Sequence, residues 1–169
     1  ASAFHICEYY KNVFNLKIYG AIFFNHESER RTDEYVTRKI TKSVARIFYN
    51  KQKKLYLGDI NAKIDWGYAR DYVDAAYRLT QLKKPDYFVI GSGKTCSIKY
   101  FVKKSFDHVG LDYKKYVLID KKLFRKSKTK TLVADTSKAK RTFNFKIKTN
   151  INKIISLMMD NDLKLEKND

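Results

Sequence analysis

Proline and cysteine are both scarce in this chain of 169 residues, which has one proline and two cysteines. Cys7 and Cys96 are far apart and form no pairing pattern, which excludes a disulfide scaffold and a four-ligand zinc site. This cysteine usage predicts a reducing, cytoplasmic compartment. No stretch approaches the ~18 consecutive apolar residues of a transmembrane helix, and no secretory signal is recognisable, so the sequence predicts no membrane partner.

Positive charge and aromatic residues are abundant by contrast. The formal net charge is +18, and hydrophobic residues make up 44% of the chain, enough to bury a core and to exclude overall disorder. Such an excess of positive charge is typical of proteins that bind nucleic acid. However, lysine outnumbers arginine 28 to 8, and a single proline stands where about eight are usual. We therefore favour a general compositional bias and keep nucleic-acid binding as the weaker alternative.

Apolar periodicity predicts helices alternating with strands, which is the α/β pattern. Gly91-Ser92-Gly93 lacks the third glycine of a dinucleotide-binding motif, and the strands are too few for a complete doubly wound sheet. The last helix is expected to fray from residue 163 onward. The predicted helices span about 1–14, 36–50, 73–80, 98–106 and 151–158, and the predicted strands span 16–24, 54–57, 87–90 and 116–119.

The polar segment 25–33 is the most informative stretch of the sequence. It follows the apolar run 16–24, which predicts a buried parallel strand, and we interpret it as a loop at the carboxyl end of that strand. Ligands bind at this edge of open α/β sheets. Asn25 and His26 offer hydrogen-bonding groups, and Arg30 and Arg31 offer forks suited to phosphate. An ordinary polar surface loop is the alternative.

Other candidates are less specific. Lys39 lies in the next helix, on the side that can face the same loop, although a solvated charge explains most single lysines. Arg125, in a lysine-rich run, can bind a phosphate or stack on a base. Trp66 is more typical of a core anchor than of a ligand platform, and Asp71 either caps the following helix or neutralises the preceding arginine. No nucleophile stands beside a base and no histidines have metal-ligand spacing, so the residues alone predict only a binding site for an anion.

Three stretches carry a resemblance to a known family. The runs Asn25–Arg31, Tyr35–Ile40 and Leu57–Tyr72 closely resemble the GDP-mannose 4,6-dehydratase family of extended short-chain dehydrogenases/reductases, and the similarity is collinear over essentially the whole chain. The resemblance implies that residues 1–169 are the C-terminal substrate-binding portion, with some strands and helices of a Rossmann-like domain. The N-terminal half, with the glycine motif and the catalytic Tyr-x-x-x-Lys, is then expected to precede Ala1.

The same resemblance implies a function. Members convert GDP-mannose to GDP-4-keto-6-deoxymannose with NADP and form homo-oligomers, and this portion by itself is expected to be inactive. It assigns no catalytic residue here. The cofactor-binding positions are His26 and Arg31, and the substrate-binding positions are Asn25, Lys39, Leu57, Gly58 and Arg125.

Two departures from the family pattern leave the substrate open. Ile64 stands where the family has a phosphate-binding arginine, and losing such a charged contact costs about 2–5 kcal/mol. Lys128 replaces an acidic residue that contacts the ribose or the base. These changes keep two alternatives: a related nucleotide-sugar epimerase or reductase, and a non-catalytic basic remnant that binds nucleic acid.

Overall fold

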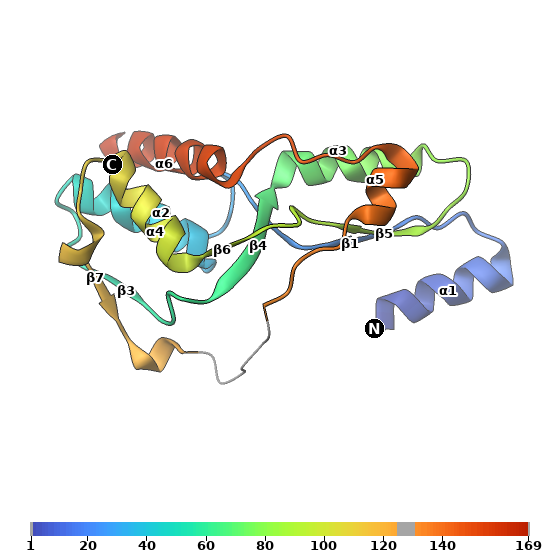
Figure 1. Cartoon of the computed structure of the whole chain (residues 1–169), viewed down its shortest axis with the longest axis horizontal. Coiled ribbons are helices and arrows are strands. Elements are labelled where there is room, and N and C mark those ends of the chain that lie inside the picture. The colour runs from blue at the N-terminus through green and yellow to red at the C-terminus, as the bar shows by residue number, and fades with distance from the viewer. Residues whose placement is uncertain (1, 125–130, 169) are drawn as a thin grey trace.

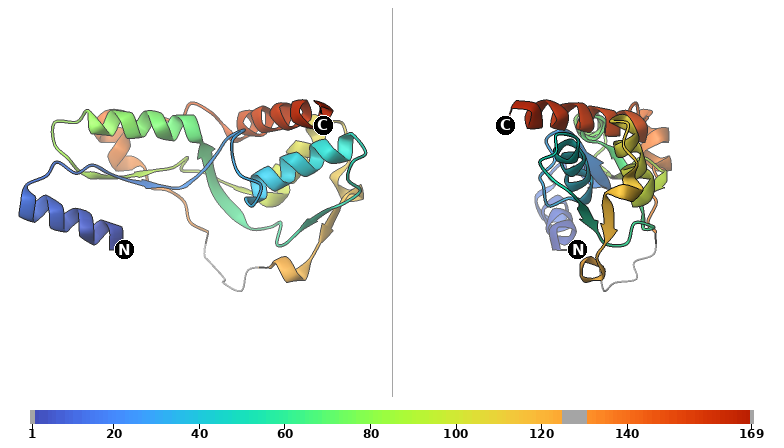
Figure 2. Two further views of the ribbon diagram at one scale, coloured as in Figure 1. Left: turned by 180° about the vertical axis from the view of Figure 1, so that it is seen from behind. Right: turned by 90° about the vertical axis from the view of Figure 1, so that its left-hand side faces the viewer.

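The computed structural model describes residues 2–124 and 131–168. This part of the chain is elongated, with α1 at one end, α2, α4 and α6 packed together at the other, and β1 and β5 between them (Figures 1 and 2). The helices are α1 (Ser2–Phe14), α2 (Val36–Phe48), α3 (Ala69–Thr80), α4 (Ile98–His108), α5 (Ser137–Phe143) and α6 (Ile151–Asn168), with short 3-10 turns η1 (Tyr113–Lys115) and η2 (Lys121–Leu123). The strands are β1 (Gly20–Phe23), β2 (Asn25–Glu27), β3 (Leu55–Leu57), β4 (Lys63–Tyr68), β5 (Tyr87–Ile90), β6 (Thr95–Ser97) and β7 (Val117–Ile119).

The strands form three small sheets. β1 pairs with β5 and β3 pairs with β7, both in parallel, while β4 lies between parallel β2 and antiparallel β6. Each parallel pair is joined through at least one helix, because parallel neighbours need a crossover connection. The predicted α/β class is confirmed. In the described ranges, no helix is both long and apolar enough to cross a membrane.

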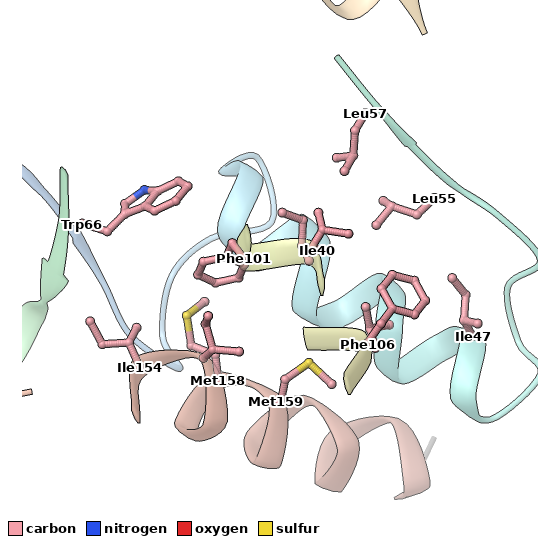
Figure 3. Packing of buried hydrophobic residues seen from close by; sticks show 13 residues of the cluster. Ile40, Ile47, Leu55, Leu57, Trp66, Phe101, Phe106, Ile154, Met158 and Met159 are labelled. Carbon is pink, nitrogen blue, oxygen red and sulfur yellow. The ribbon is translucent and has the colours of Figure 1, made fainter. Parts of the chain in front are cut away.

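The larger hydrophobic core lies where α2, α4 and α6 meet β3 (Figure 3). Ile40, Phe101 and Met158, one from each helix, have no exposed surface. Trp66 of β4 is 5% exposed, and its ring centre is 5.4 Å from that of Phe101 at an angle typical of edge-to-face pairs. The interpretation of Trp66 as a core anchor is therefore confirmed.

A second, smaller core joins α3, β5 and α5. Tyr72, Phe88 and Phe143 come from these three elements, and the rings of Phe88 and Phe143 meet edge to face at 5.2 Å. This core holds the helices against one side of the β1–β5 pair.

The strand predicted over 16–24 is shorter and more exposed than expected. Only Gly20–Phe23 form β1, which has β5 as its one partner among the described strands. Ile22 is 53% exposed and Phe23 is 40% exposed, so the prediction of a buried strand is wrong for this part of the chain. The run is apolar enough for burial, but no described element covers it.

The prediction that the chain frays from residue 163 is also wrong. Helix α6 continues to Asn168 because acidic side chains in its last turns form ion pairs with basic side chains on and just after α2. Asp162 Oδ1 lies 2.9 Å from a guanidinium nitrogen of Arg38, and Glu166 Oε2 lies 3.5 Å from the ammonium nitrogen of Lys51. Both carboxylates are almost fully buried, which fixes the last turns against α2.

Candidate functional site

The polar segment after β1 begins with a short strand rather than a loop. Main-chain atoms of Asn25–Glu27 pair with β4, with Asn25 opposite Trp66 and Glu27 opposite Tyr68. The prediction of a loop over 25–33 is therefore wrong for its first three residues. Backbone pairing does not depend on side-chain polarity, so a polar run can form a strand where a free edge is available. From Ser28 onward the chain turns toward α2.

Asn25 and His26 present different groups at this edge. The Asn25 side chain is exposed, and its backbone carbonyl accepts from the Tyr72 hydroxyl at 3.3 Å. His26 Nδ1 lies 3.0 Å from the Phe24 carbonyl oxygen. Because a carbonyl only accepts, Nδ1 carries the proton and Nε2 of the neutral ring is left as an acceptor. The rings of Phe23 and Tyr72 flank the imidazole at 5.7 and 5.3 Å.

Glu27 is the functional candidate that the sequence analysis missed. It is 2% exposed, accepts a 2.6 Å hydrogen bond from the Thr37 hydroxyl, and lies 3.4 Å from Arg31 Nε. Burial raises the pKa of its carboxyl above the ordinary value of 4.5, although Thr37 and Arg31 act in the opposite direction. Strand alternation was the available signal, since it places residue 27 on the face opposite to residue 26.

Arg31 is held in place from two sides. Its Nε faces Glu27, and its guanidinium carbon lies over the Tyr35 ring, 3.3 Å from the ring centre. The side chain is 18% exposed. Among the described residues, no acceptor is paired with its terminal nitrogens, which are therefore free to donate to an anion.

Lys39 is connected to this turn through α2. The helix forms because Val36, Ile40 and Val44 recur at helical spacing, and the Glu27–Thr37 hydrogen bond ties its first turn to β2. Lys39 follows two positions later, is half-buried, and has no acidic partner in the described ranges. Lys42, three positions further along α2, pairs with Asp33 at 2.5 Å.

Leu57 and Gly58 lie on the other sheet, β3–β7. The Leu57 side chain is 2% exposed in the larger core, and its carbonyl accepts from the Asp120 amide at 2.8 Å. A Cβ at Gly58 would come within 2.6 Å of the Leu123 carbonyl oxygen, so close packing requires the glycine. Any ligand contact here would therefore come from the Gly58 backbone. Arg125 and Lys128 lie outside the described residues.

Two buried aspartates have structural roles that the sequence did not indicate. Asp65 is 1% exposed and accepts four hydrogen bonds: from the Ser92 amide (2.9 Å) and hydroxyl (2.5 Å), the Gly93 amide (3.0 Å) and the Ala134 amide (3.0 Å). This carboxylate therefore joins β4 to the loop after β5 and to the segment before α5.

Asp71 neither caps α3 nor neutralises the preceding arginine, so both interpretations of it were wrong. Its carboxylate accepts from the Lys148 and Thr149 amides at 3.0 and 2.9 Å and so anchors the linker between α5 and α6. These partners lie more than 70 residues away, beyond what local spacing reveals. In the part of the chain that the structure describes, no group of three His, Cys, Asp or Glu side chains is arranged to hold a metal ion.

Comparison with known proteins agrees with this geometry. The model of the family described as GDP-mannose 4,6 dehydratase matches residues 1–158. The chain belongs to this family. It is 42% identical over 158 residues to GDP-mannose 4,6 dehydratase 1 of Arabidopsis thaliana, covering 94% of this chain and 44% of that protein. The human GDP-mannose 4,6 dehydratase is 34% identical, with 96% and 48% covered.

Solved structures show the same fold. RMD from Pseudomonas aeruginosa complexed with NADPH superposes with a TM-score of 0.86 at 16% identity, over 95% of this chain and 52% of that chain. The dTDP-glucose 4,6-dehydratase of Bacillus anthracis in complex with NAD gives a TM-score of 0.82 at 18% identity, over 99% and 51%. The chain spans about half the length of the relatives it matches. The expected extended short-chain dehydrogenase/reductase fold is confirmed.

Proposed function

We propose that this chain forms the C-terminal, nucleotide-sugar-binding portion of a GDP-mannose 4,6-dehydratase that uses NADP. Membership of the family supports the reaction class. In this proposal the acid–base groups and the glycine-rich phosphate loop are supplied by the remaining half of the enzyme, and this portion alone has no turnover. Its role is to bind and orient the sugar nucleotide.

One structural observation carries the proposal: the Asn25–Arg31 turn and the first turn of α2 are joined into a single unit by the buried Glu27–Thr37 hydrogen bond. An exposed amide, an imidazole nitrogen that can accept a hydrogen bond, and two cations are thereby presented from one unit. We infer that Asn25 contacts the sugar nucleotide and that Lys39 contacts its diphosphate. A positioned cation of this kind is suited to a phosphate oxygen.

His26 and Arg31 fit the phosphate-bearing end of NADP. The guanidinium is already oriented by Glu27 and Tyr35, so little side-chain entropy is lost when its terminal nitrogens bind an anion. The His26 Nε2 acceptor suits a hydroxyl donor of the cofactor. When bound, the nicotinamide supplies reversible hydride transfer at the sugar. In this proposal the residues of this chain orient the sugar nucleotide and the cofactor, and none of them acts as general acid or base.

A chimeric enzyme tests the proposal directly. The chain is joined behind the N-terminal portion of the Arabidopsis relative that precedes the matched region, and conversion of GDP-mannose to its 4-keto-6-deoxy product is followed with NADP. We expect product from the chimera and none from the 169-residue chain. Lys39→Gln should lower kcat/KM at least tenfold, whereas the exposed Lys53→Gln should change it less than twofold. Product from the chain alone, or none from a folded chimera, would contradict the proposal.

The identity of the sugar nucleotide is tested at Ile64. This side chain packs against the larger core and carries no charge where the family pattern has arginine. If GDP-mannose is the substrate, Ile64→Arg should tighten its binding in the chimera by roughly tenfold, measured by calorimetry, because a charged contact to phosphate is restored. Lys63→Arg, one position earlier and exposed, serves as the control. No gain for GDP-mannose together with a gain for another nucleotide sugar would favour the epimerase or reductase alternative.

A further inference from the structure

Arg38 is buried where the Asn25–Arg31 turn meets helix α6, which packs against α2 (Figures 1 and 3). Its three guanidinium nitrogens face three different groups. Nη1 donates to the Glu29 backbone carbonyl, Nη2 lies 2.9 Å from Asp162 Oδ1, and Nε lies 3.8 Å from Asp33 Oδ1. This one side chain therefore joins α2 to the polar turn and to the second half of α6.

The turn depends on such contacts because it lacks regular backbone pairing. Residues 28–35 lie between β2 and α2, outside the helices and strands of the described chain. The Glu29 carboxylate accepts from the Tyr68 hydroxyl at 3.1 Å, whereas the Glu29 main chain is held by Arg38. Arg38 therefore restrains the backbone of the turn two residues before Arg31.

Neighbouring residues of α2 hold alternate positions of the turn. Thr37 donates to the buried Glu27 carboxylate, and Arg38 donates to the Glu29 carbonyl. Glu27 in turn lies 3.4 Å from Arg31 Nε. The orientation of the Arg31 guanidinium thus depends on both anchors.

Stability alone does not account for the buried Arg38–Asp162 pair. Taking two charges out of water costs free energy, and apolar residues of similar volume often replace such a pair without loss. Burial raises the pKa of the Asp162 carboxyl above its ordinary value of 3.8, while Thr41 and Arg38 act in the opposite direction. An apolar pair could not donate to the Glu29 carbonyl, so the contact with the turn is what the arginine adds.

We propose that Arg38, anchored by Asp162, is a positioning residue for cofactor selection. It holds the turn so that the Arg31 guanidinium faces the phosphate that distinguishes NADP from NAD. Arg38 acts through Arg31 and contacts no ligand itself. This inference rests on the proposed function, because it concerns the same turn.

A matched pair of double variants tests the proposal, because a second ion pair joins α2 to α6 away from the turn. Arg46 Nη1 lies 3.6 Å from Glu166 Oε1. Arg38→Met/Asp162→Leu and Arg46→Met/Glu166→Leu each remove one positive and one negative charge. Only the first removes a described contact with the turn.

Cofactor affinity is measured by calorimetry on the chimeric enzyme. Arg38→Met/Asp162→Leu should weaken NADP binding at least tenfold and NAD binding less than threefold, because NAD lacks the phosphate that Arg31 contacts. Arg46→Met/Glu166→Leu should change both affinities less than twofold. Equal weakening of NADP and NAD would indicate a general loss of structure and overturn the proposal, as would unchanged NADP binding.

Amide exchange in the 169-residue chain measures the turn directly. The Arg31 amide donates to the Ser28 carbonyl at 3.1 Å, and its exchange should be about tenfold faster in the Arg38 double variant and unchanged in the Arg46 double variant. If the wild-type chimera fails to convert GDP-mannose, the proposed function fails, but this measurement still decides whether Arg38 holds the turn. Unchanged exchange at Arg31 would overturn the proposal.

Arg38→Lys is the second variant if the double variant does not fold. Its single ammonium group keeps the positive charge beside Asp162 but lacks the fork that reaches Asp162 and Glu29 together. We expect NADP binding about threefold weaker and faster exchange at Arg31, with no change for Arg46→Lys. In that case, wild-type values of Arg38→Lys in both measurements would overturn the proposal.

Discussion

The two ends of the molecule differ in how they use apolar residues. In the α2–α4–α6 unit, helices from three separate parts of the sequence bury their apolar faces on one another, and even the charged Asp162 and Glu166 are enclosed. In α1 no residue is buried, and the large apolar side chains of Phe4, Tyr9 and Phe14 are each about half exposed. Large apolar side chains therefore occur at both ends, but only in the α2–α4–α6 unit do described elements bury them.

This difference has a consequence for stability. Burial of a large apolar side chain contributes about 1.5–3 kcal/mol, and an exposed one contributes little. We therefore expect substitutions to be costly in the α2–α4–α6 unit and nearly neutral in α1. Four predictions test this contrast, from the largest effect to the smallest.

Phe101→Ala should cost about 3–5 kcal/mol in the free energy of unfolding, because it leaves a cavity beside Trp66 in the larger core. Tyr9→Ala in α1 should cost less than about 0.5 kcal/mol. Urea unfolding followed by circular dichroism measures both. Similar losses for the two variants would break the contrast and show that α1 is covered in solution.

Arg38→Met should cost about 3 kcal/mol, because it leaves the buried Asp162 carboxylate without its partner at 2.9 Å. The double variant Arg38→Met/Asp162→Leu should recover most of this loss, since neither charge then remains buried. A double-mutant cycle in urea gives the coupling. An additive double variant would show that the pair does not join α2 to α6.

Asp65→Asn should lower the free energy of unfolding by about 2 kcal/mol. The carboxylate accepts hydrogen bonds on both oxygens, whereas the NH2 group of asparagine would face one of these amide donors and could not accept from it. The loss is expected to appear as faster amide exchange at Ser92 and Gly93 as well as in urea unfolding. The exposed Asp59→Asn is the control and should change stability by less than about 0.5 kcal/mol. Unchanged exchange at these amides would contradict the anchoring role of Asp65.

Glu27→Gln should have the smallest effect, within about 1 kcal/mol, and should depend on pH. The raised pKa means that the folded state binds its proton more tightly than the unfolded state does. The contribution of this carboxyl to the free energy of unfolding is therefore complete below pH 4.5, and it is lost as the pH rises through the raised pKa. The Gln variant should lack this component. Parallel pH profiles of unfolding would contradict the raised pKa of the Glu27 carboxyl.

Much of the fold was predictable because its signals are local. The helix over 36–48 follows from apolar residues at helical spacing, and the Ser97 side chain caps α4 by accepting from the Tyr100 amide at 3.1 Å. Gly110, two residues after the end of α4, has a φ of +70°, a conformation that favours glycine after a helix. Each of these depends on residues within one or two turns of one another.

The candidate site was only partly predictable. The polar residues after β1 were identified from their position, but the partner that orients Arg31 was not. Glu27 faces Arg31 directly, but the carboxylate is buried and fixed by the hydroxyl of Thr37, ten residues away on α2. No spacing rule predicts this contact between a strand and a helix. The link from Arg38 to the turn was missed for the same reason, because Glu29, Arg38 and Asp162 are brought together only by the fold.

The sequence by itself determined the α/β pattern, the main helices and the polar turn, because these depend on periodicity and on neighbouring side chains. Only the tertiary structure decided which apolar residues are buried, which backbone amides donate to Asp65 and Asp71, and which segments Arg38 joins. Those outcomes depend on contacts between segments tens of residues apart, and the free energy of a buried charge or ring is set by what surrounds it.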